Sequence, residues 1–414
     1  MEWRSQALRA LRDRKEVPVL ILGGGVNGAG LFRELAFQGV ECLLVDRSDF
    51  AAGATSKSSR MIHGGLRYLE NAEFRLVREA LRERNLLLET ARHYVSPLET
   101  TIPLFSWFAG AIRSPLVFLG LPVAPGERGA LVVKLGLAFY DLFSRPGRRM
   151  PKHRMRSRAE SLRRIPDLNP AIVGTATYWD SRITQAERLC VELVQDALRA
   201  SPRSAALNYV RLEGLDGPGV VLRDEPTGET LRVRPRVVVN ATGAWVDLAN
   251  RSLGVETRYM GGTKGSHLVV RNERLVRALG DRMVYYQHRD GRVCIAFGFF
   301  GKAILGSTDI PVADPDAASC DEAEVAYMLE TLRRVFPAIE VSRSDIAYKF
   351  CGVRPLPATG DAIPGRITRD HSIRPSEPEG SRPFPILSLV GGKWTTFRAL
   401  AEQAADLVLA RLGT

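Results

Sequence analysis

The chain has 414 residues, of which 45% are hydrophobic and 25% are charged, and its formal net charge at pH 7 is +12. This composition is ordinary for a globular protein, and the length allows two or three domains or one large mixed domain. The five cysteines form no CxxC pair and have no zinc-ligand spacing, which argues against a disulfide framework and indicates a reducing compartment.

The first strong motif is a glycine-rich turn after an apolar run at residues 17–22. Gly23, Gly25 and Gly28 occupy the GxGxxG positions, an amphipathic run follows, and a second apolar run ends on Asp46. The first glycine permits a tight turn, the second lets the backbone approach a pyrophosphate, and the third lets the helix pack on the strand. The helix N-terminus attracts phosphate, and Asp46 is suitably placed along the chain to accept from ribose hydroxyls. This order of elements predicts a dinucleotide-binding unit.

The segment after Asp46 indicates which dinucleotide is bound. Residues 50–60 are small and rich in hydroxyl groups, and residues 61–70 read Met-Ile-His-Gly-Gly-Leu-Arg-Tyr-Leu-Glu. A soluble core does not need such a run, whereas a flavin does. Hydroxyls and backbone N–H groups can line the flavin diphosphate, and Gly64 and Gly65 can let the backbone lie against the flat ring. At this block the sequence resembles the FAD-dependent glycerol-3-phosphate dehydrogenases and oxidases.

Residues 100–126 are the most apolar part of the chain. Arg113 and four prolines interrupt the run. A spanning helix needs about 20 uninterrupted apolar residues, so we reject a transmembrane segment. Two alternatives remain open, a buried irregular lid and a surface that dips into a membrane interface.

The next segment, residues 145–164, is strongly basic. Nine Lys and Arg residues face one acid, Glu160, which is an excess of eight in a chain of net charge +12. A solvated loop is the commoner structure for such a run, and contact with anionic lipid is the functional alternative because the apolar stretch is adjacent. No helix-turn-helix, zinc or aromatic-stacking motif accompanies the run, so we expect no nucleic-acid partner.

Four later segments continue the resemblance. A strand that begins near residue 236 ends in Asn-Ala-Thr-Gly-Ala-Trp at residues 240–245, where we expect cofactor contact. Residues 264–267 read Lys-Gly-Ser-His, and residues 351–356 read Cys-Gly-Val-Arg-Pro-Leu. Gly-Gly-Lys-Trp-Thr-Thr at residues 391–396 follows a strand and opens a helix. Its glycines and N–H groups suit the O2 edge of a flavin, where negative charge grows on reduction.

The sequence departs from the family pattern in three places. In one segment the family has an acid and an arginine, which this chain keeps as Asp180 and Arg188, whereas the residues between them differ from the family pattern. We expect this segment to start a helix that runs to about residue 199. Where the family usually has a Pro-Trp pair, this chain has Phe297-Gly298, followed by Phe299-Phe300. We also expect no counterpart of the family's additional C-terminal helical domain.

The resemblance covers nearly the whole chain and implies its architecture. It implies a mixed α/β flavoprotein of the D-amino-acid-oxidase-like superfamily, with a Rossmann-like FAD-binding domain and an antiparallel-sheet substrate domain. The FAD-binding domain is expected at residues 17–95, 165–255 and 350–414, and the substrate-binding or cap region at residues 96–164 and 256–349.

The resemblance also implies a set of site residues. Arg67, Arg354 and Lys393 form the expected cationic set near the flavin ring, where a substrate phosphate needs arginine or lysine donors. The residues expected to act on the substrate are His63, Arg67, Tyr68, His267, Arg354 and Lys393. His63 and His267 are both candidates for the base that takes the hydroxyl proton, because imidazole titrates near neutrality. The residues expected to bind FAD are Gly23, Gly25, Asn27, Gly28, Asp46, Thr55, Ser56, Ser59, Gly64, Gly65, Leu66, Thr242, Gly243, Trp245, Gly392, Lys393 and Thr395. No metal ligand is expected.

The implied reaction is oxidation of sn-glycerol 3-phosphate to dihydroxyacetone phosphate by hydride transfer to FAD, with electrons passed to quinone or oxygen. Two alternatives stay open, oxidation of another small anionic hydroxy acid or amine and a flavin-carrying subunit of a redox assembly. The cationic set argues against the second alternative. Residues 1–16 lack the apolar core and cleavage site of a secretory signal, so we expect a cytoplasmic protein, with peripheral contact to the inner face of the membrane as an open alternative.

Overall fold

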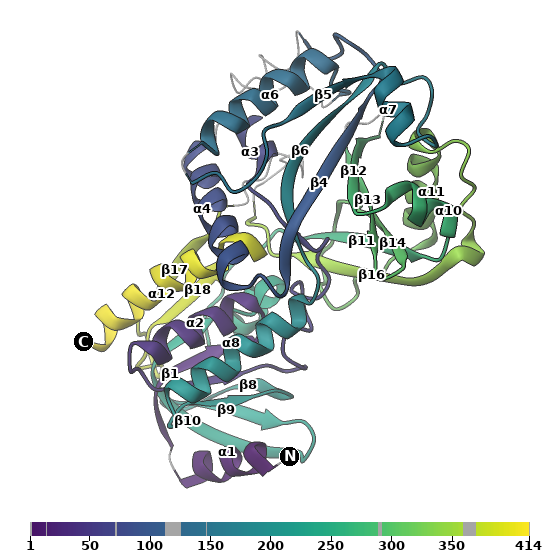
Figure 1. The fold of residues 1–414 in the computed structure, drawn as a ribbon. Helices are drawn as coiled ribbons and strands as arrows, with labels where there is room; N and C mark the ends of the chain where they lie inside the picture. Colours follow the sequence, from purple (N-terminus) through teal and green to yellow (C-terminus); the bar gives the residue numbers. More distant parts are fainter. Residues whose placement is uncertain are drawn as a thin grey trace.

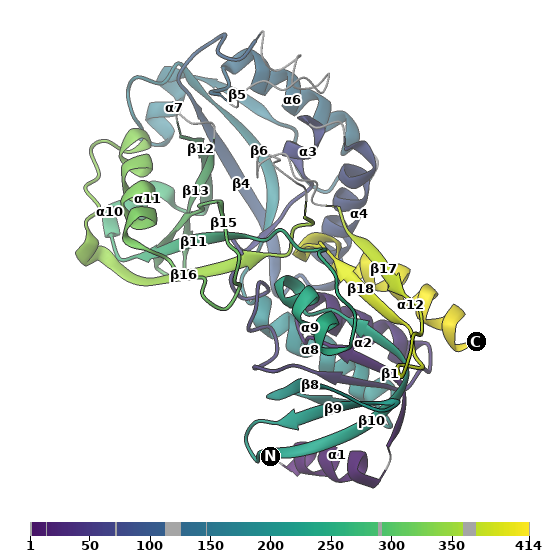
Figure 2. The same cartoon turned by 180° about the vertical axis from the view of Figure 1, so that it is seen from behind.

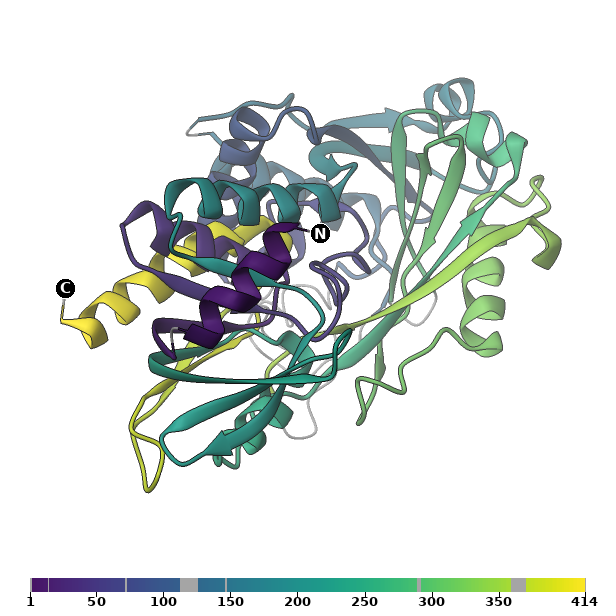
Figure 3. The ribbon, with the colours of Figure 1, turned by 90° about the horizontal axis from the view of Figure 1, so that it is seen from below.

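The computed structural model describes residues 2–13, 15–70, 73–111, 126–145, 147–288, 292–358 and 370–413. These residues form two sheets with helices packed on them, one sheet below the other in the view of Figure 1. Seen from below in Figure 3, the purple, teal and yellow elements of the first sheet lie beside the green strands of the second.

The first sheet is built around β1 (Glu16–Leu22), which pairs in parallel with β2 (Cys42–Val45) and β10 (Glu229–Asn240). Its strand order is β17-β18-β10-β1-β2-β7, and β8 and β9 continue from β10 as an antiparallel ribbon. Its other strands are β7 (Ala205–Leu207), β8 (Val210–Asp216), β9 (Gly219–Asp224), β17 (Ser372–Ser376) and β18 (Ile386–Val390). Every residue of β2 and β18 is buried, as expected for parallel strands covered on both faces.

Helices cover one face of this sheet. The apolar sides of α2 (Val26–Phe37), α8 (Ala186–Ala200) and α12 (Phe397–Leu412) share one core with β1, β2, β10 and β18. On the other face the β8–β9 ribbon shares a second core with α1 (Glu2–Asp13) (Figure 2). The carboxyl ends of the parallel strands therefore stay open for a ligand.

The second sheet has the strand order β15-β11-β14-β13-β12-β4-β6-β3, with β16 paired to β11 and β5 paired to β6. The β12–β4 pair is parallel and the others are antiparallel. Its strands are β3 (Met61–Ile62), β4 (Val95–Leu104), β5 (Arg154–Ser157), β6 (Gly174–Ile183), β11 (Thr263–Val270), β12 (Arg282–Gln287), β13 (Val293–Phe299), β14 (Lys302–Gly306), β15 (Ile310–Pro311) and β16 (Ile346–Arg354).

Two groups of helices pack on the second sheet. The first comprises α10 (Glu273–Leu279) and α11 (Glu322–Val335), which share a core with β11 to β14. The second comprises α3 (Leu66–Glu70), α4 (Phe74–Thr90) and α6 (Ala130–Phe143), which lie against β4 and β6. The remaining short elements are α7 (Arg158–Arg164), α9 (Val246–Ser252) and the 3-10 turns η1 (Gly243–Trp245), η2 (Arg343–Asp345) and η4 (Trp394–Thr396).

This architecture confirms the predicted fold class and corrects some elements. Asp180 lies in β6 rather than in a helix, because residues 174–183 form one long, mostly buried strand paired with β4, and the helix begins later at Ala186. The strand expected to begin near residue 236 is the second half of a longer strand, β10, which begins at Glu229.

The apolar and basic segments are now placed in part. Residues 100–104 end β4, whereas residues 112–125 lie outside the part of the chain that the structure describes. The end of the basic run forms β5 and α7, and Ser157 and Glu160 make a capping box at the start of α7. None of the described helices combines the length and apolar content that a bilayer crossing requires.

Candidate active site

A cavity of about 670 Å³ begins at the carboxyl ends of β1 and β2 and extends to β11 and β16 of the second sheet. Its volume is in the range of about 300–1,000 Å³ that small-molecule and cofactor sites occupy. It is long and mixed in character, with glycines and hydroxyls at one end and cationic and aromatic side chains at the other.

The glycine turn forms one end of the cavity. Gly23 has φ +103°, and a Cβ there would meet the Ala241 carbonyl oxygen at 2.6 Å. Gly25 is the N-cap of α2 and lines the cavity. A Cβ on Gly28 would lie 1.9 Å from the Gly23 carbonyl oxygen, so only glycine allows α2 to cross β1 this closely.

Asp46 lines the cavity at the end of β2. Its carboxylate accepts hydrogen bonds from the N–H groups of Gly24 at 2.7 Å and Ser48 at 2.8 Å. Burial raises the pKa of Asp46, and those two N–H groups and Arg47 oppose the rise. The carboxylate is held in position with further lone pairs available to hydroxyl donors.

The hydroxyl-rich segment supplies two of its three predicted side chains to the cavity. Thr55 Oγ1 accepts from the N–H of Val26 at 3.0 Å, and Ser59 Oγ lies 2.8 Å from His267 Nε2. Ser56 Oγ instead donates to carbonyls within its own turn, and Ser56 does not line the cavity.

Residues of the 240–245 and 391–396 motifs form further parts of the cavity wall. Thr242, Gly243 and Trp245 line it, as do Asn27 and Gly392. Asn27 Oδ1 is buried and makes no hydrogen bond within the described residues. An acceptor of this kind beside a helix N-terminus and a glycine turn fits a dinucleotide that carries donors of its own.

The other end of the cavity brings five predicted substrate residues together. His63, Tyr68, His267, Arg354 and Lys393 all line it. Lys393 Nζ lies 4.1 Å from the centre of the Tyr68 ring, and the rings of His63 and Tyr68 are 5.8 Å apart. The structure therefore concentrates positive charge and two imidazoles in one place.

Arg354 is held by several groups of the second sheet. Its guanidinium donates to Asp309 Oδ1 at 3.1 Å, Ser307 Oγ at 3.1 Å and the carbonyl of Thr308 at 2.9 Å. A Cβ on Gly265 would lie 2.1 Å from the guanidinium, which rests on that backbone. The position of the charge at the cavity wall is therefore strongly constrained.

His267 is buried in β11 and neutral at pH 7. Burial, followed by the positive charges of Arg354 and Arg60, lowers its pKa from 6.5 to about 3. Its ring stacks on Phe350 at 4.9 Å, and its Nδ1 makes no hydrogen bond within the described residues.

Other predicted site residues lie outside the cavity lining. They are Gly28, Ser56, Gly64, Gly65, Leu66 and Thr395. A Cβ on Gly64 would meet the Tyr140 hydroxyl at 2.1 Å, and one on Gly65, at φ +81°, would meet the Tyr68 ring at 2.1 Å. These two glycines make room for protein side chains. The side chain of Arg67 is outside the described part of the chain.

A buried network that sequence reasoning missed supports the Gly64 turn. Asp180 Oδ1 accepts from Gly64 N at 2.9 Å, Arg84 Nη1 at 3.0 Å and the Tyr140 hydroxyl at 3.1 Å. The side chains of Arg84 and Asp180 are each 2% exposed. Arg188, the arginine noted with Asp180 in the sequence, pairs instead with Glu192 on the surface. The burial of Arg84 could not be predicted from the sequence, because a charged residue in an amphipathic helix usually faces solvent.

A parallel sheet with this glycine turn, together with the flanking cavity, defines a Rossmann-type dinucleotide-binding fold. The chain belongs to the family of FAD-dependent oxidoreductases, whose family model matches residues 18–406. Its cofactor is FAD, as predicted, and the chain is an oxidoreductase.

Curated relatives confirm the resemblance noted in the sequence. The chain is 35% identical to a glycerol-3-phosphate dehydrogenase of Synechocystis over 95% of this chain and 70% of that one. It is 33% identical to the aerobic glycerol-3-phosphate dehydrogenase of Escherichia coli over 94% and 72% of the two chains. It is also 33% identical to a D-erythritol 1-phosphate dehydrogenase of Brucella abortus over 93% and 72%.

Solved structures show the same fold. A glycerol-3-phosphate dehydrogenase from Bacillus halodurans complexed with FAD has a TM-score of 0.71 at 23% identity, over 100% of this chain and 69% of that one. An L-alpha-glycerophosphate oxidase from Mycoplasma pneumoniae with FAD bound has a TM-score of 0.68 at 18% identity, over 95% and 94%.

Proposed function

We propose that this chain oxidises sn-glycerol 3-phosphate to dihydroxyacetone phosphate, with FAD as hydride acceptor and quinone or oxygen as the final acceptor. The observation that carries the proposal is the cationic end of the cavity, where Arg354 and Lys393 stand beside two imidazoles. A phosphate dianion needs such donors, and a secondary alcohol needs a base. The names of the relatives from Synechocystis and Escherichia coli support the same substrate.

The residues at the cationic end of the cavity have different roles toward the substrate. Bound FAD supplies the hydride acceptor. Arg354 and Lys393 hold the phosphate, and Tyr68 lies under Lys393. His63 lines this end and is the first candidate for the base that accepts the hydroxyl proton. His267 is the second candidate, because burial and the charges of Arg354 and Arg60 lower its pKa to about 3 and make it a weak proton acceptor, and Ser59 Oγ lies 2.8 Å from its Nε2.

A longer polyol phosphate is the second candidate substrate. The relative from Brucella abortus is named for D-erythritol 1-phosphate, which carries the same phosphate and adjoining hydroxyls. Phe297, the residue where the family pattern changes, is fully buried among Met283, Ile295 and Ile304, and it does not line the cavity. The change at this residue therefore carries no argument against either substrate.

Anaerobic bleaching of the bound flavin tests the proposal. We expect sn-glycerol 3-phosphate to reduce the flavin, whereas glycerol, which lacks the phosphate, should reduce it far more slowly. D-Erythritol 1-phosphate, a small hydroxy acid and glycine serve as the other arms. Faster reduction by the erythritol phosphate would select the second candidate. Reduction by the hydroxy acid or the amine alone would refute a phosphate substrate.

We also propose that an exposed apolar surface contacts a membrane. It consists of Trp107, Phe108, Leu131, Leu135, Phe139 and Leu142, whose exposed fractions range from 39% to 72%. Ala130 N donates to the Ser106 carbonyl, and Leu131 N donates to the Trp107 carbonyl, so the two segments are contiguous. Arginines of β5 and α7 lie at the same end of the molecule as α6 (Figure 1). An apolar surface near basic side chains fits anionic lipid.

Vesicle binding tests this surface. We expect the chain to sediment with vesicles of phosphatidylglycerol and phosphatidylcholine, and less so as salt rises, because surface charges are screened. Phe108→Glu with Leu135→Glu should release it. Phe37→Glu is the matched control, since Phe37 is 58% exposed on α2, away from this surface. Equal binding of both variants, or no binding by the parent chain, would refute the membrane proposal.

A further inference from the structure

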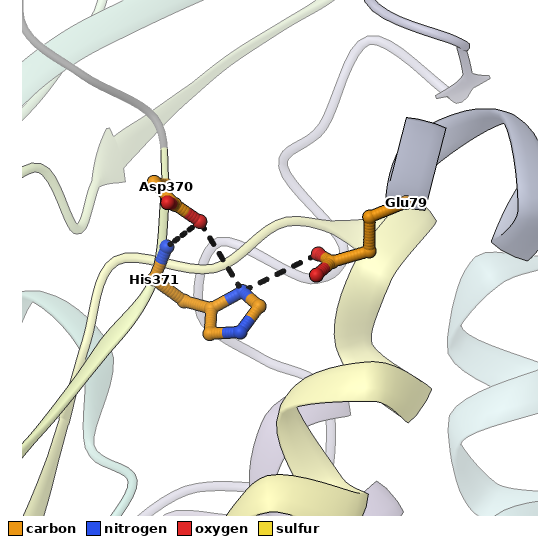
Figure 4. Close-up of side chains that lie close together, drawn as sticks. All are labelled: Glu79, Asp370 and His371. Carbon is orange, nitrogen blue, oxygen red and sulfur yellow. Dashed lines mark hydrogen bonds and ion pairs between the residues drawn. The ribbon is translucent and has the colours of Figure 1, made fainter. Parts of the chain in front are cut away.

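A cluster of one histidine and two carboxylates lies behind the glycine loop of the cavity. Glu79 of α4, Asp370 and His371 direct their ligand atoms toward one another, and those atoms lie within 4.8 Å (Figure 4). His371 Nδ1 is 3.8 Å from Glu79 Oε1 and 3.9 Å from Asp370 Oδ1. The His371 side chain is 2% exposed, and that of Glu79 is 15% exposed.

The hydrogen bonding of His371 leaves one ring nitrogen facing the carboxylates. Nε2 lies 3.1 Å from Gln403 Oε1, an oxygen that only accepts, so Nε2 carries the proton. In the neutral ring, Nδ1 then has no proton and carries a lone pair that can accept a hydrogen bond or bind a cation. Nδ1 and Glu79 Oε1 are both buried, and neither makes a hydrogen bond within the described residues. Two acceptors that face each other in a buried site are stabilised by a proton or a cation placed between them.

Arg75 supplies positive charge only from the outside. Its guanidinium pairs with Asp370 and lies 3.6 Å from Glu79 Oε2, while its side chain is 65% exposed. It therefore reaches the outer oxygens, and no described side chain bridges the inner pair of His371 Nδ1 and Glu79 Oε1.

We propose that Glu79, Asp370 and His371 bind a divalent transition-metal ion, for which Zn²⁺ is the probe. Zinc takes nitrogen and oxygen ligands at about 2.0–2.2 Å, so two ligand atoms of one tetrahedral ion stand about 3.4 Å apart. The observed separations of 3.8 and 3.9 Å are close to that spacing and too long for direct hydrogen bonds. Gln403 has the role of an outer partner that fixes the ring and its tautomer.

The site is connected to the cavity. The Asp370 carbonyl oxygen lies 2.6 Å from where a Cβ on Gly391 would be, and Gly392 and Lys393 line the cavity. The charge of Lys393 also acts on Glu79. A bound ion would tie α4 to the start of β17, next to the loop that carries Lys393. It would therefore stiffen the wall beside the flavin.

Zinc titration of the FAD-loaded full chain tests the proposal. After removal of metal with a chelator, calorimetry should show one Zn²⁺ site, and His371→Gln should weaken it by at least tenfold. Gln403→Leu should weaken it by about tenfold or more, the scale of a lost outer partner. His93→Gln is the matched control, because His93 pairs with Glu192 on the surface and should leave Zn²⁺ affinity unchanged.

The sign of the Arg75 effect separates the proposal from a purely structural ion pair. Arg75→Ala removes the competing cation from an exposed position, so it should tighten Zn²⁺ binding severalfold. If His371 is simply an imidazolium paired with Glu79, Arg75→Ala and His371→Gln will not alter Zn²⁺ binding. Equal affinities in the parent chain, His371→Gln and Arg75→Ala would overturn the proposal.

Discussion

Replacing Arg354 with alanine is expected to slow reduction of the bound flavin by the substrate by about a hundred- to a thousandfold, the scale of one preorganised donor. Flavin content should fall little, because the glycine turn and Asp46 lie at the other end of the cavity. Stopped-flow reduction of the FAD-loaded variant measures the effect. Arg354→Lys should recover only part of the rate, since an ammonium cannot reproduce the fork of donors.

The competing explanation is that Arg354 only stabilises the second sheet. Its contacts with Asp309, Ser307 and Thr308 make this explanation concrete. Asp309→Asn is the matched control, because it weakens the same ion pair and keeps the arginine. If Asp309→Asn slows reduction as much as Arg354→Ala, the guanidinium acts through the sheet and has no direct role toward the substrate.

Replacing Asp180 with alanine is expected to lower the free energy of unfolding more than any substitution on the surface does. It removes one partner of a buried ion pair, which costs about 3–5 kcal/mol of unfolding free energy because Arg84 is left buried without its carboxylate. It also removes the acceptor of Gly64 N, so His63 and Tyr68 lose the support of their turn. Urea titration and the melting temperature of the FAD-loaded chain measure the loss.

Two further variants test whether the loss of stability comes from the buried ion pair. Arg188→Ala should leave the unfolding free energy nearly unchanged, because its pair with Glu192 is on the surface. Exchanging both buried partners, Arg84→Met with Asp180→Leu, should recover part of the loss, since an apolar pair leaves no unpaired charge. A fully stable Asp180→Ala variant would contradict the assignment of this network.

The cofactor could be predicted from the sequence, for a physical reason. Gly23, Gly25, Gly28 and Asp46 act through backbone geometry and chain spacing, which are local properties of a strand, a turn and a helix. The motif near residue 240 and the one at residue 391 each follow a buried strand of the same sheet, so their approach to the cavity follows from strand order.

The parts that could not be predicted depend on distant contacts. Asp180 meets Arg84 and Tyr140 only because β6, α4 and α6 pack together, and no local pattern shows that. The Glu79 and His371 pair has the same origin, since the two residues lie almost 300 positions apart. The closeness of Gly64 to Tyr140 and of Gly65 to Tyr68 is likewise a feature of the packed structure that the local pattern does not show.

The strand order of the first sheet has a consequence for biosynthesis. Glu16 of β1 pairs with Arg234 of β10, and β10 in turn pairs with β18 at Ile386–Val390. A ribosome adds about 5–20 residues per second, so roughly 10–40 s pass between the synthesis of β1 and that of β10, its second neighbour in the sheet. Throughout that interval β1 presents an unpaired edge, which is a template for pairing with other chains. The nascent chain is therefore most exposed to aggregation long before β18 can complete the sheet, and holding chaperones would act in that period.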